Sequence, residues 1–507
     1  MINIKLKKLE DLGKIASDLK KQGKKIVHAH GVYDLFHVGH KRHLENGKKY
    51  GDVLFVTITT DNHVNKGPSR PVFTEILRAE MLASLIFVDY VAISPNPSAE
   101  KVISIIKPDI YLKGSEYSKE QNDITGKITT EVDTVKKYGG EVVFTNEVTF
   151  SSSNLTNRFL PVHPKEVQTY LEGLRKKVTI NDIKEYIEKA KKNKALVIGD
   201  IILDEYVYVD AMGKPSKENI ISTRYKEKEI FTGGVIATAN ILSKFCDDLT
   251  VMSAIGSNCG HEGFIKRGFD STVVFEPIYR KNSCTTIKSR IVDSGYSRKL
   301  FEVSYIDDSP MNKEDYEKLN NNLIEKFNSI DYLVVNDFGH GLIDESIIDT
   351  LTKSNKFLSI NTQTNSANRG FNLITKYKKA DLICIDEPEA RLATGDRFSE
   401  IDIVFKKLRE RINCNTIIIT HGKKGCYVST SKDEIERVPA LTQNPVDTIG
   451  AGDAFFAAVS PLIASGCPAH IASFIASALA SMKVAMVGHR HQITYIEIIK
   501  YLITLLK

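Results

Sequence analysis

Short segments rich in β-branched and aromatic residues alternate with helical patterns along most of this 507-residue chain. In the first part we expect strands at 25–29, 53–59, 90–93, 110–112 and 141–144, with helices at 40–50, 73–84 and 99–106 between them. Strands that alternate with helices form parallel sheets covered by helices on both faces. The spacing therefore predicts an α/β fold that begins with a compact, doubly wound domain.

A second α/β series begins at residue 195, after a stretch without predicted strands. Residues 161–193 show two charged helical patterns, and Thr179 followed by Asp182 is typical of a helix N-cap. Strands are then expected at 195–200, 332–337, 357–361, 382–386 and 416–422, and a pair of apolar helices near 450–487 follows them. We therefore predict a first domain at 1–160, a helical linker at 161–193 and a second domain at 194–507. The two halves carry different motifs, which indicates a fusion rather than a duplication.

The charge balance argues against a nucleic-acid partner. The 69 Lys and Arg residues against 63 Asp and Glu residues give a formal net charge of +6. This small excess suits anionic small substrates, and no basic patch interleaved with aromatic residues occurs. The seven cysteines include no CxxC pair, which argues against a zinc or redox motif and favours reduced thiols in a cytosol.

The hydropathy pattern argues against a membrane partner. The first 25 residues are charged and amphipathic and lack the apolar core of a signal peptide. The most apolar stretch, 454–488, favours two buried helices over a membrane span, because it is interrupted by Ser460, Pro461, Gly466, Pro468 and His470. We expect a soluble, cytoplasmic protein.

The segment after the first predicted strand reads His-Gly-Val-Tyr-Asp-Leu-Phe-His-Val-Gly-His at 30–40. His37 and His40 lie three residues apart at the start of a predicted helix, so they share one helix face. The helix N-terminus adds amide donors and positive potential, and Gly39 lets a ligand approach the backbone. This arrangement is typical of a site for an α-phosphate whose transition state gains negative charge.

These residues resemble the signature of the cytidylyltransferase-like nucleotidyltransferases, and similar blocks continue through residues 25–160. The resemblance implies a Rossmann-like domain in which His37 and His40 stabilise the α-phosphate. It further implies that Lys66 neutralises the triphosphate and that Asp34 orients the nucleotide. The nucleotide-binding residues implied are Gly31, Tyr33, Asp34, Ser151, Ser152 and Ser153. This chain has Ala29-His30-Gly31 in place of the family's asparagine-bearing block, and the sequence leaves ATP and CTP open as the nucleotide.

A second motif, Val-Asp-Thr-Ile-Gly-Ala-Gly-Asp at 446–453, precedes a long apolar helix. The small residues Gly450, Ala451 and Gly452 allow their amides to point at an anion without obstruction. Asp453, in the first helical turn, can accept a proton from an attacking hydroxyl while those amides neutralise charge on a transferred phosphoryl group. The motif therefore predicts phosphoryl transfer.

This motif resembles that of the PfkB, or ribokinase-like, carbohydrate kinases, and the resemblance covers roughly 194–507. It implies a ribokinase-like α/β domain with Asp453 as catalytic base and with Mg²⁺ organised by Glu389 through water. The sugar-binding residues implied are Asp200, Asp204, Gly233, Gly234 and Asn240. The nucleotide-binding residues implied are Asp386, Glu389, Thr420, Gly422, Gly425, Gly450, Ala451 and Gly452.

Two basic positions of the heptose kinases in this family are absent. Those kinases carry Asp-Pro-Lys after the strand that here reads Leu-Ser-Ile-Asn-Thr-Gln at 358–363, and a lysine near the position of His340. Lys288, Arg290 and Arg298 are candidates to replace that positive charge. Whether the sugar carries a second phosphate therefore stays open in the sequence.

The two motifs together indicate successive steps toward a nucleotide-activated sugar. A kinase acting on an anomeric hydroxyl makes a sugar 1-phosphate, which a nucleotidyltransferase then converts to a nucleotide sugar. The chain is similar to the bifunctional heptose kinase/adenylyltransferases, with the domain order reversed, and this implies ATP, Mg²⁺ and a homo-oligomer. Two alternatives stay open. One is a CTP-dependent enzyme for another phosphorylated alcohol or sugar, and the other is a kinase-like domain that only binds sugar.

Overall fold

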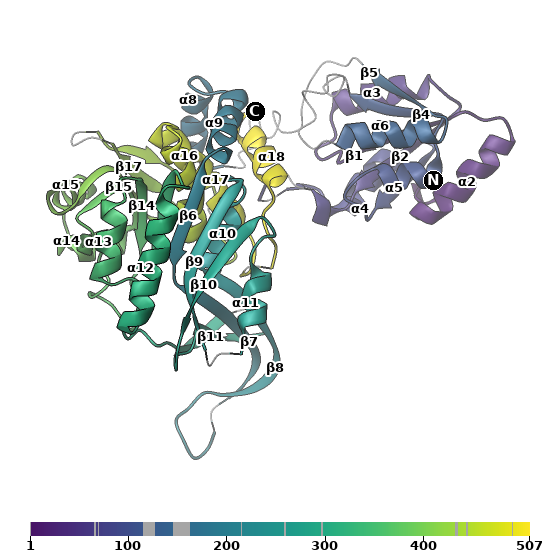
Figure 1. Cartoon of the computed structure of the whole chain (residues 1–507). Helices are drawn as coiled ribbons and strands as arrows, with labels where there is room; N and C mark the ends of the chain where they lie inside the picture. The colour runs from purple at the N-terminus through teal and green to yellow at the C-terminus, as the bar shows by residue number, and fades with distance from the viewer. Residues whose placement is uncertain are drawn as a thin grey trace. The chain divides into compact units, whose positions relative to one another are not determined.

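The computed structural model describes residues 2–64, 67–68, 70–114, 127–145, 163–213, 215–257, 260–295, 298–430, 434–442, 445–488 and 490–507. Lys66, Ser151, Ser152 and Ser153 lie outside these residues. The chain divides into two compact units (Figure 1), one comprising Met1–Gln168 with Tyr495–Lys507 and the other Thr169–Thr494. The domain boundaries that we expected at 160 and 194 stay predictions.

The first unit contains a five-stranded parallel sheet with the strand order β3-β2-β1-β4-β5. Its strands are β1 (Ile26–Gly31), β2 (Val53–Thr59), β3 (Tyr90–Ser94), β4 (Ile110–Gly114) and β5 (Glu141–Thr145). Its helices are α1 (Ile2–Lys5), α2 (Leu9–Lys21), α3 (Val38–Lys48), η1 (Asp61–His63), α4 (Glu75–Ala83), α5 (Glu100–Ile106), α6 (Lys127–Lys137) and α18 (Tyr495–Leu506). The five predicted strands and the doubly wound order are confirmed.

Strand β2 shows why this sheet forms. All seven of its residues are buried, and successive side chains enter cores on opposite faces. Leu54, Val56 and Ile58 pack in one cluster, while Val53 and Phe55 pack in the other. A strand covered by helices on both faces reads as a continuous apolar run, which is the pattern seen in the sequence.

The second unit is built on a nine-stranded sheet with the order β10-β9-β6-β13-β14-β15-β16-β17-β18. The strands from β10 to β16 in this order are parallel, and β17 and β18 are antiparallel additions at one edge. Their bounds are β6 (Lys194–Gly199), β9 (Asp248–Gly256), β10 (Val273–Arg280), β13 (Tyr332–Asp337), β14 (Phe357–Thr362), β15 (Lys379–Asp386), β16 (Asn413–Thr420), β17 (Cys426–Ser429) and β18 (Glu436–Val438).

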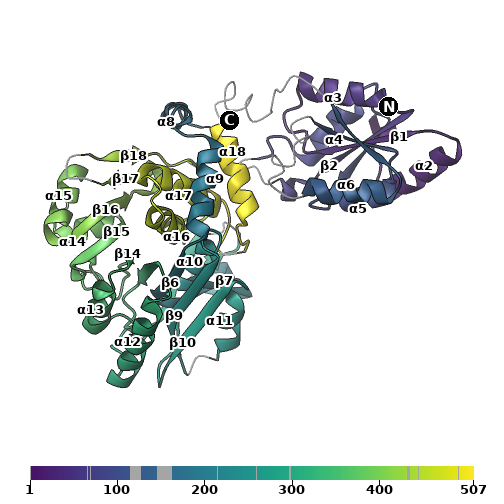
Figure 2. The ribbon, with the colours of Figure 1, turned by 45° about the horizontal axis from the view of Figure 1, so that its top comes forward.

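Helices cover both faces of this sheet, with α12 to α15 on one face and α9, α10, α16 and α17 on the other (Figure 2). The helices are α9 (Ile180–Lys191), α10 (Val235–Leu242), α11 (Glu262–Gly268), α12 (Lys313–Phe327), α13 (Glu345–Lys353), α14 (Glu387–Thr394), α15 (Ile401–Arg411), α16 (Ala451–Ala464), α17 (Ala469–Lys483), η4 (Ile374–Lys376) and η5 (Gly422–Lys424). Helix α8 (Lys165–Arg175) spans the boundary between the units. The expected capping box between Thr179 and Asp182 at the start of α9 is confirmed.

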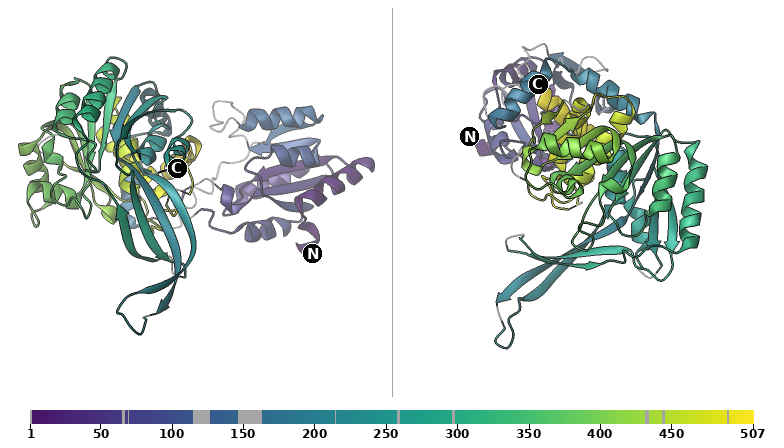
Figure 3. Two further views of the ribbon diagram at one scale, coloured as in Figure 1. Left: turned by 60° about the horizontal axis from the view of Figure 1, so that its bottom comes forward. Right: turned by 90° about the vertical axis from the view of Figure 1, so that its left-hand side faces the viewer.

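A four-stranded sheet in the second unit was not predicted. It has the order β12-β11-β7-β8 and consists of β7 (Ile201–Gly213), β8 (Ser222–Gly234), β11 (Thr286–Asp293) and β12 (Arg298–Tyr305). The long strands β7 and β8 extend beyond the rest of the unit (Figures 1 and 3). Their many charged residues obscure the alternating pattern, because the far halves of both strands are exposed.

The apolar stretch at 454–488 forms the two buried helices α16 and α17, as predicted. Within the described ranges, every helix is too short or too polar to cross a bilayer.

Candidate functional site

In the first unit, the candidate site lies where the strand order reverses, at the carboxyl ends of β1 and β4. Ligands of doubly wound sheets bind at this switch point. Helix α3 begins directly after β1 and is capped by His37, whose Nδ1 accepts a hydrogen bond from the Gly39 amide at 3.1 Å. The His37 and His40 rings are stacked with their centroids 3.9 Å apart. The structure thus brings the two predicted imidazoles together at a helix N-terminus.

Tyr33 and Gly31 support this imidazole pair. The Tyr33 ring meets His40 edge-on at 5.3 Å between centroids. A Cβ atom at Gly31 would lie 3.1 Å from the Tyr33 ring, so the absence of a side chain lets the tyrosine pack here. Tyr33 itself has a left-handed φ of 51°, which turns the chain sharply after β1.

Asp34 makes its contacts within the protein. Its buried carboxylate pairs with Arg70 Nη1 at 3.1 Å and accepts the Val72 amide at 3.0 Å. It therefore holds the segment around residue 70 near the end of β1. This contact differs from the direct nucleotide contact that the family resemblance implies.

A buried polar cluster behind this site was not predicted. His28 Nε2 and His30 Nδ1 each lie 2.8 Å from Thr57 Oγ1. Burial, with the charge of His30 as a smaller cause, holds the pKa of His28 well below its usual range, so this ring is neutral. The alternation of histidines within a strand was the available signal, since alternate residues face one side of a sheet.

In the second unit, the predicted residues gather at the carboxyl edge of the nine-stranded sheet. The amide of Gln363, after β14, donates to Asp453 Oδ1 at 2.5 Å, and the amide of Asn336, in β13, lies 3.5 Å from the same oxygen. Burial, with the charge of Asp204 as a smaller cause, raises the pKa of Asp453 to about 6. The carboxylate is therefore ionised at neutral pH and can accept a proton.

The loop before Asp453 is anchored through Asp447. The Asp447 carboxylate accepts the Ile449 amide at 3.2 Å and the Gly488 amide at 3.1 Å, and it pairs with Lys299 at 2.8 Å. Gly450 then adopts a left-handed φ of 74° and caps α16. A Cβ atom at Gly452 would meet nothing within 4 Å, so the start of α16 faces open space.

Two predicted sugar-site residues, Asp204 and Asp200, each have a glycine beside them that leaves no room for a side chain. Asp204 pairs with Arg290 at 2.5 Å, and a Cβ atom at Gly233 would lie 2.3 Å from Asp204 Oδ2. A Cβ atom at Gly234 would lie 2.4 Å from the carbonyl oxygen of Asp200. Burial, with the charge of Asp337 as a smaller cause, raises the pKa of Asp200 to about 7.

The side chain of Asn240, a predicted sugar-binding residue, forms hydrogen bonds with the backbone. Its amide nitrogen donates to the Gly268 carbonyl at 2.7 Å, and its side-chain oxygen accepts the Asp270 amide at 2.7 Å. Both ends of the side chain thus connect α10 to the segment that follows α11. Its place supports the sheet around Gly233 and Gly234.

The predicted nucleotide residues form two local structures. Asp386 and Glu389 make a capping box at the start of α14, and Glu389 Oε1 accepts the Thr364 amide at 3.0 Å. Thr420 ends β16 and leads into the turn that contains Gly422 and Gly425. A Cβ atom at Gly425 would lie 2.0 Å from the Val438 carbonyl oxygen, so this turn requires a glycine.

The chemistry of Glu389 suits a divalent cation. Burial, with the charge of Asp386 as a smaller cause, raises the pKa of Glu389 to about 8. A nearby cation would therefore stabilise the ionised form of this carboxylate. Across the residues that the structure describes, no cluster of three or more His, Cys, Asp and Glu side chains could hold a metal ion. The oxygen donors therefore fit Mg²⁺ that is held mainly by nucleotide phosphates and water.

Of the three basic candidates near the sugar site, Lys288 is available to a ligand. Arg290 is paired with Asp204 and with Glu302, and Arg298 is exposed. Lys288 is half-buried on β11 opposite Asp204 in the strand register. Burial, with the charge of Lys288 as a smaller cause, lowers the pKa of His340 to about 3, so His340 does not replace the missing lysine charge.

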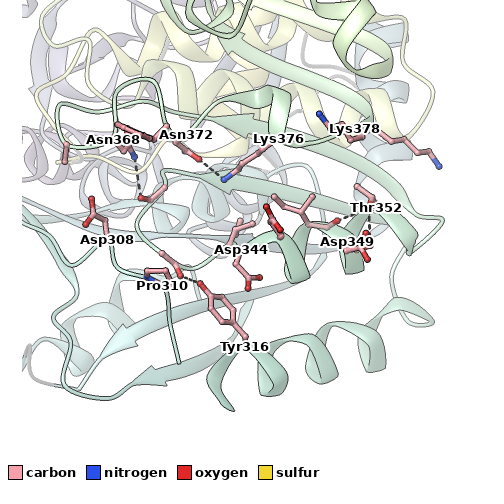
Figure 4. Close-up of a pocket in the computed structure, with 18 residues that line it drawn as sticks. Asp308, Pro310, Tyr316, Asp344, Asp349, Thr352, Asn368, Asn372, Lys376 and Lys378 are labelled. Atoms are coloured by element: carbon pink, nitrogen blue, oxygen red, sulfur yellow. Dashed lines mark hydrogen bonds between the residues drawn. The ribbon is translucent and has the colours of Figure 1, made fainter. Parts of the chain in front are cut away.

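A groove of about 1000 Å³ is lined in part by Gly339 and Gly341, which flank His340 (Figure 4). None of the predicted site residues lines it. Asn368 and Asn372 line the groove and donate to the carbonyls of Phe338 and Asp337, at 2.8 and 2.9 Å. The groove wall therefore fixes the loop after β13, which carries the amide of Phe338 that donates to Asp200.

Comparisons with known proteins match two family models to this chain. The model of the pfkB family carbohydrate kinases matches residues 192–494, and the model of the cytidylyltransferase-like proteins matches residues 28–228. The bifunctional protein HldE of Geobacter metallireducens is 38% identical over 168 residues, which are 32% of each chain. That of Aliarcobacter butzleri is 40% identical over 142 residues, 27% of this chain and 29% of the relative.

The matched region spans about a third or less of the length of these curated relatives. Among solved structures, phosphofructokinase-2 from Escherichia coli in complex with potassium has a TM-score of 0.50 at 14% identity, covering 62% of this chain and all of that one. This likeness shows the ribokinase-like fold. Because the pfkB model covers more than half of the chain, the chain belongs to the pfkB family of carbohydrate kinases, and it also carries a cytidylyltransferase-like domain.

Proposed function

We propose that this chain makes a nucleotide-activated sugar in two steps. The second unit phosphorylates a heptose-like sugar at its anomeric hydroxyl, and the first unit transfers a nucleotidyl group to the resulting sugar 1-phosphate. The proposal rests on one observation above all. The carboxyl group of Asp453 is held by the amides of Gln363 and Asn336 in the first turn of α16, and a side chain at Gly452 in that turn would meet nothing within 4 Å. The reactions use substrates of the cytoplasm, where we place the protein.

In the kinase step, Asp453 accepts the proton of the anomeric hydroxyl. The sugar oxygen then attacks the γ-phosphorus of ATP, the bond to the β-phosphate oxygen breaks, and ADP leaves. The amides of Gly450, Ala451 and Gly452 stabilise the negative charge that develops on the transferred group. Mg²⁺, near Glu389, would neutralise charge on the ATP phosphates. Thr420, Gly422 and Gly425 hold the rest of the nucleotide.

Asp200 and Asp204 orient the sugar by accepting hydrogen bonds from its hydroxyls, with the Gly233–Gly234 backbone beside them. Their burial strengthens such hydrogen bonds, because the surroundings compete weakly for them. The hydrogen bond from Gln363 to Asp453 favours a kinase over a domain that only binds sugar, because it positions the proposed catalytic base. Heptose 7-phosphate is the first acceptor to test, with Lys288 as a cation for its phosphate.

In the nucleotidyl-transfer step, an oxygen of the sugar 1-phosphate attacks the α-phosphorus of a nucleoside triphosphate, and pyrophosphate leaves. His37 and His40 donate hydrogen bonds to the α-phosphate oxygens as negative charge grows there. Lys66 and the hydroxyls of Ser151, Ser152 and Ser153 would bind the leaving phosphates. We propose ATP as the nucleotide on the resemblance to the heptose kinase/adenylyltransferases, and CTP is the alternative nucleotide. A homo-oligomer fits both families.

Asp453→Asn should abolish the kinase step selectively. The variant keeps the shape of the side chain but removes the proton acceptor, so sugar phosphorylation should fall about 100-fold or more. ADP release and phosphorus NMR of the anomeric phosphate measure this loss. Nucleotidyl transfer to added sugar 1-phosphate should be unchanged, and Asp402→Asn on the exposed face of α15 is the matched control. Unchanged phosphorylation in Asp453→Asn would contradict the role of Asp453 as the base, whereas no phosphorylation by the wild type would favour the sugar-binding alternative.

The kinase should lose activity at acid pH as Asp453 is protonated. Because its pKa is raised to about 6, kcat/KM should fall about tenfold per pH unit below pH 6. Gln363→Leu removes a donor that stabilises the carboxylate, so the midpoint should move to higher pH. The nucleotidyl-transfer rate of the same samples serves as a control for acid damage. A midpoint near pH 4 that Gln363→Leu leaves in place contradicts the assignment.

His40→Asn should slow nucleotidyl transfer while leaving the kinase intact. The variant removes one of the two stacked imidazoles at the start of α3, and the expected loss of pyrophosphate release is about 100-fold. Assays with ATP and with CTP as the only nucleotide identify the base. His63→Asn, which changes an imidazole bonded to the Pro95 carbonyl, is the control. Equal rates for the His40 variant and wild type rule out this role.

A further inference from the structure

Lys483, the last residue of α17, is a buried cation that the reactions described above do not use. Its side chain is only 3% exposed, and its Nζ donates to the carbonyl oxygen of Gly488. Its neighbours on the last turn of α17, Leu479, Ser481 and Met482, are buried as well. A charge is costly in such a place unless nearby groups compensate it. The compensation comes from the phosphoryl-transfer site.

A chain of hydrogen bonds leads from Lys483 to the loop before Asp453. Gly488, which accepts from Lys483, donates its own amide to Asp447 at 3.1 Å, and Asp447 accepts the amide of Ile449. The Val484 carbonyl oxygen also accepts the amide of Val446 at 2.7 Å. Lys483 thus fastens the segment after α17 to the segment that presents Gly450–Gly452.

Three carboxylates of the site also act on Lys483. Burial, the largest cause, lowers the pKa of Lys483 to about 8, while the charges of Asp447, Asp204 and Asp453 oppose this shift. The ammonium is therefore largely charged at neutral pH. Lys299 also pairs with Asp447, but it is 39% exposed, so its charge is better screened by water. Lys483 is the cation on the buried side of this loop.

We infer that Lys483 is a positioning residue for phosphoryl transfer, an internal cation that keeps the 446–452 loop in place when phosphates bind beside it. The inference rests on the proposed kinase function. Bound ATP adds negative charge next to Asp447 and Asp453, and repulsion would displace the loop without a positive charge behind it. A tethered ammonium supplies that charge without the entropy cost of capturing an ion from solution.

The test compares Lys483→Ala with Lys483→Met in the full chain. Both remove the charge, but alanine leaves space for a small ion, whereas methionine fills it with apolar atoms. Sugar phosphorylation should fall about 100-fold in both variants, because displaced phosphate-binding groups lose most of their catalytic effect. Ammonium or methylammonium chloride should restore activity at least in part to Lys483→Ala and not to Lys483→Met. Tetramethylammonium chloride, which is too large, should restore neither.

Binding of ATP, measured by calorimetry, separates this inference from the proposed reaction. ATP affinity should fall in Lys483→Ala and recover with ammonium, whether or not the acceptor sugar has been identified. Lys353→Met, at an exposed ion pair with Asp349 on α13, is the control and should match wild type. Wild-type ATP affinity and turnover in Lys483→Met would overturn the inference. So would losses in Lys483→Ala that ammonium does not restore, since these indicate a packing role alone.

Discussion

Parallel pairing of β6, β13, β14, β15 and β16 is the constraint on which the kinase site depends. Because these strands run in one direction, their carboxyl ends meet at one edge of the sheet. Residues that follow different strands, such as Asp200, Gln363 and Glu389, therefore gather there although they are far apart in sequence. Helix α16 then directs Asp453 toward the same edge, where two of the strands supply the amides that hold it.

Positively charged side chains compensate several of the buried carboxylates in the kinase site. Buried carboxylates need partners, and most of them have basic ones: Asp204 pairs with Arg290, Asp337 with Lys376 and Asp447 with Lys299. Asp453 differs, because its hydrogen-bond donors are neutral amides. A neutral environment keeps the carboxylate basic enough to take a proton, whereas a salt bridge would lower its pKa. Lys483 adds a charge behind the loop without contacting the base itself.

The candidate site of the first unit also lies at the carboxyl edge of a parallel sheet, here one of five strands. This candidate site lies at the β1/β4 switch point, where the start of α3 brings two stacked imidazoles together, and we propose that these donate to phosphate oxygens. In the proposed function, the chemical link between the units is the sugar 1-phosphate, the product of one site and the substrate of the other. Covalent fusion keeps the two activities in equal amounts.

The sequence alone determined the helices and strands that carry the two motifs, and it predicted the chemistry of those motifs. The strands of the first sheet, the parallel strands that carry the kinase residues, the cap at Thr179 and the pair of helices after Gly450 all follow from local periodicity. The glycines at 233 and 234 were expected in the sugar site, and the Asp204 carboxylate beside Gly233 and the Asp200 carbonyl beside Gly234 explain why no larger residue fits there. Local pattern suffices for these features, because they depend on neighbours within a few residues.

Only the tertiary structure decided which protein groups these polar side chains contact. Asp34 holds the segment at residue 70 and Asn240 holds that at 268–270, whereas Gln363 positions the base. The sheet formed by β7, β8, β11 and β12 and the buried charge of Lys483 were likewise missed. Partners more than twenty residues away fix these roles, except for Lys483, whose burial depends on how α17 packs. Hydrogen bonding and burial are set by packing, and the local sequence carries no record of them.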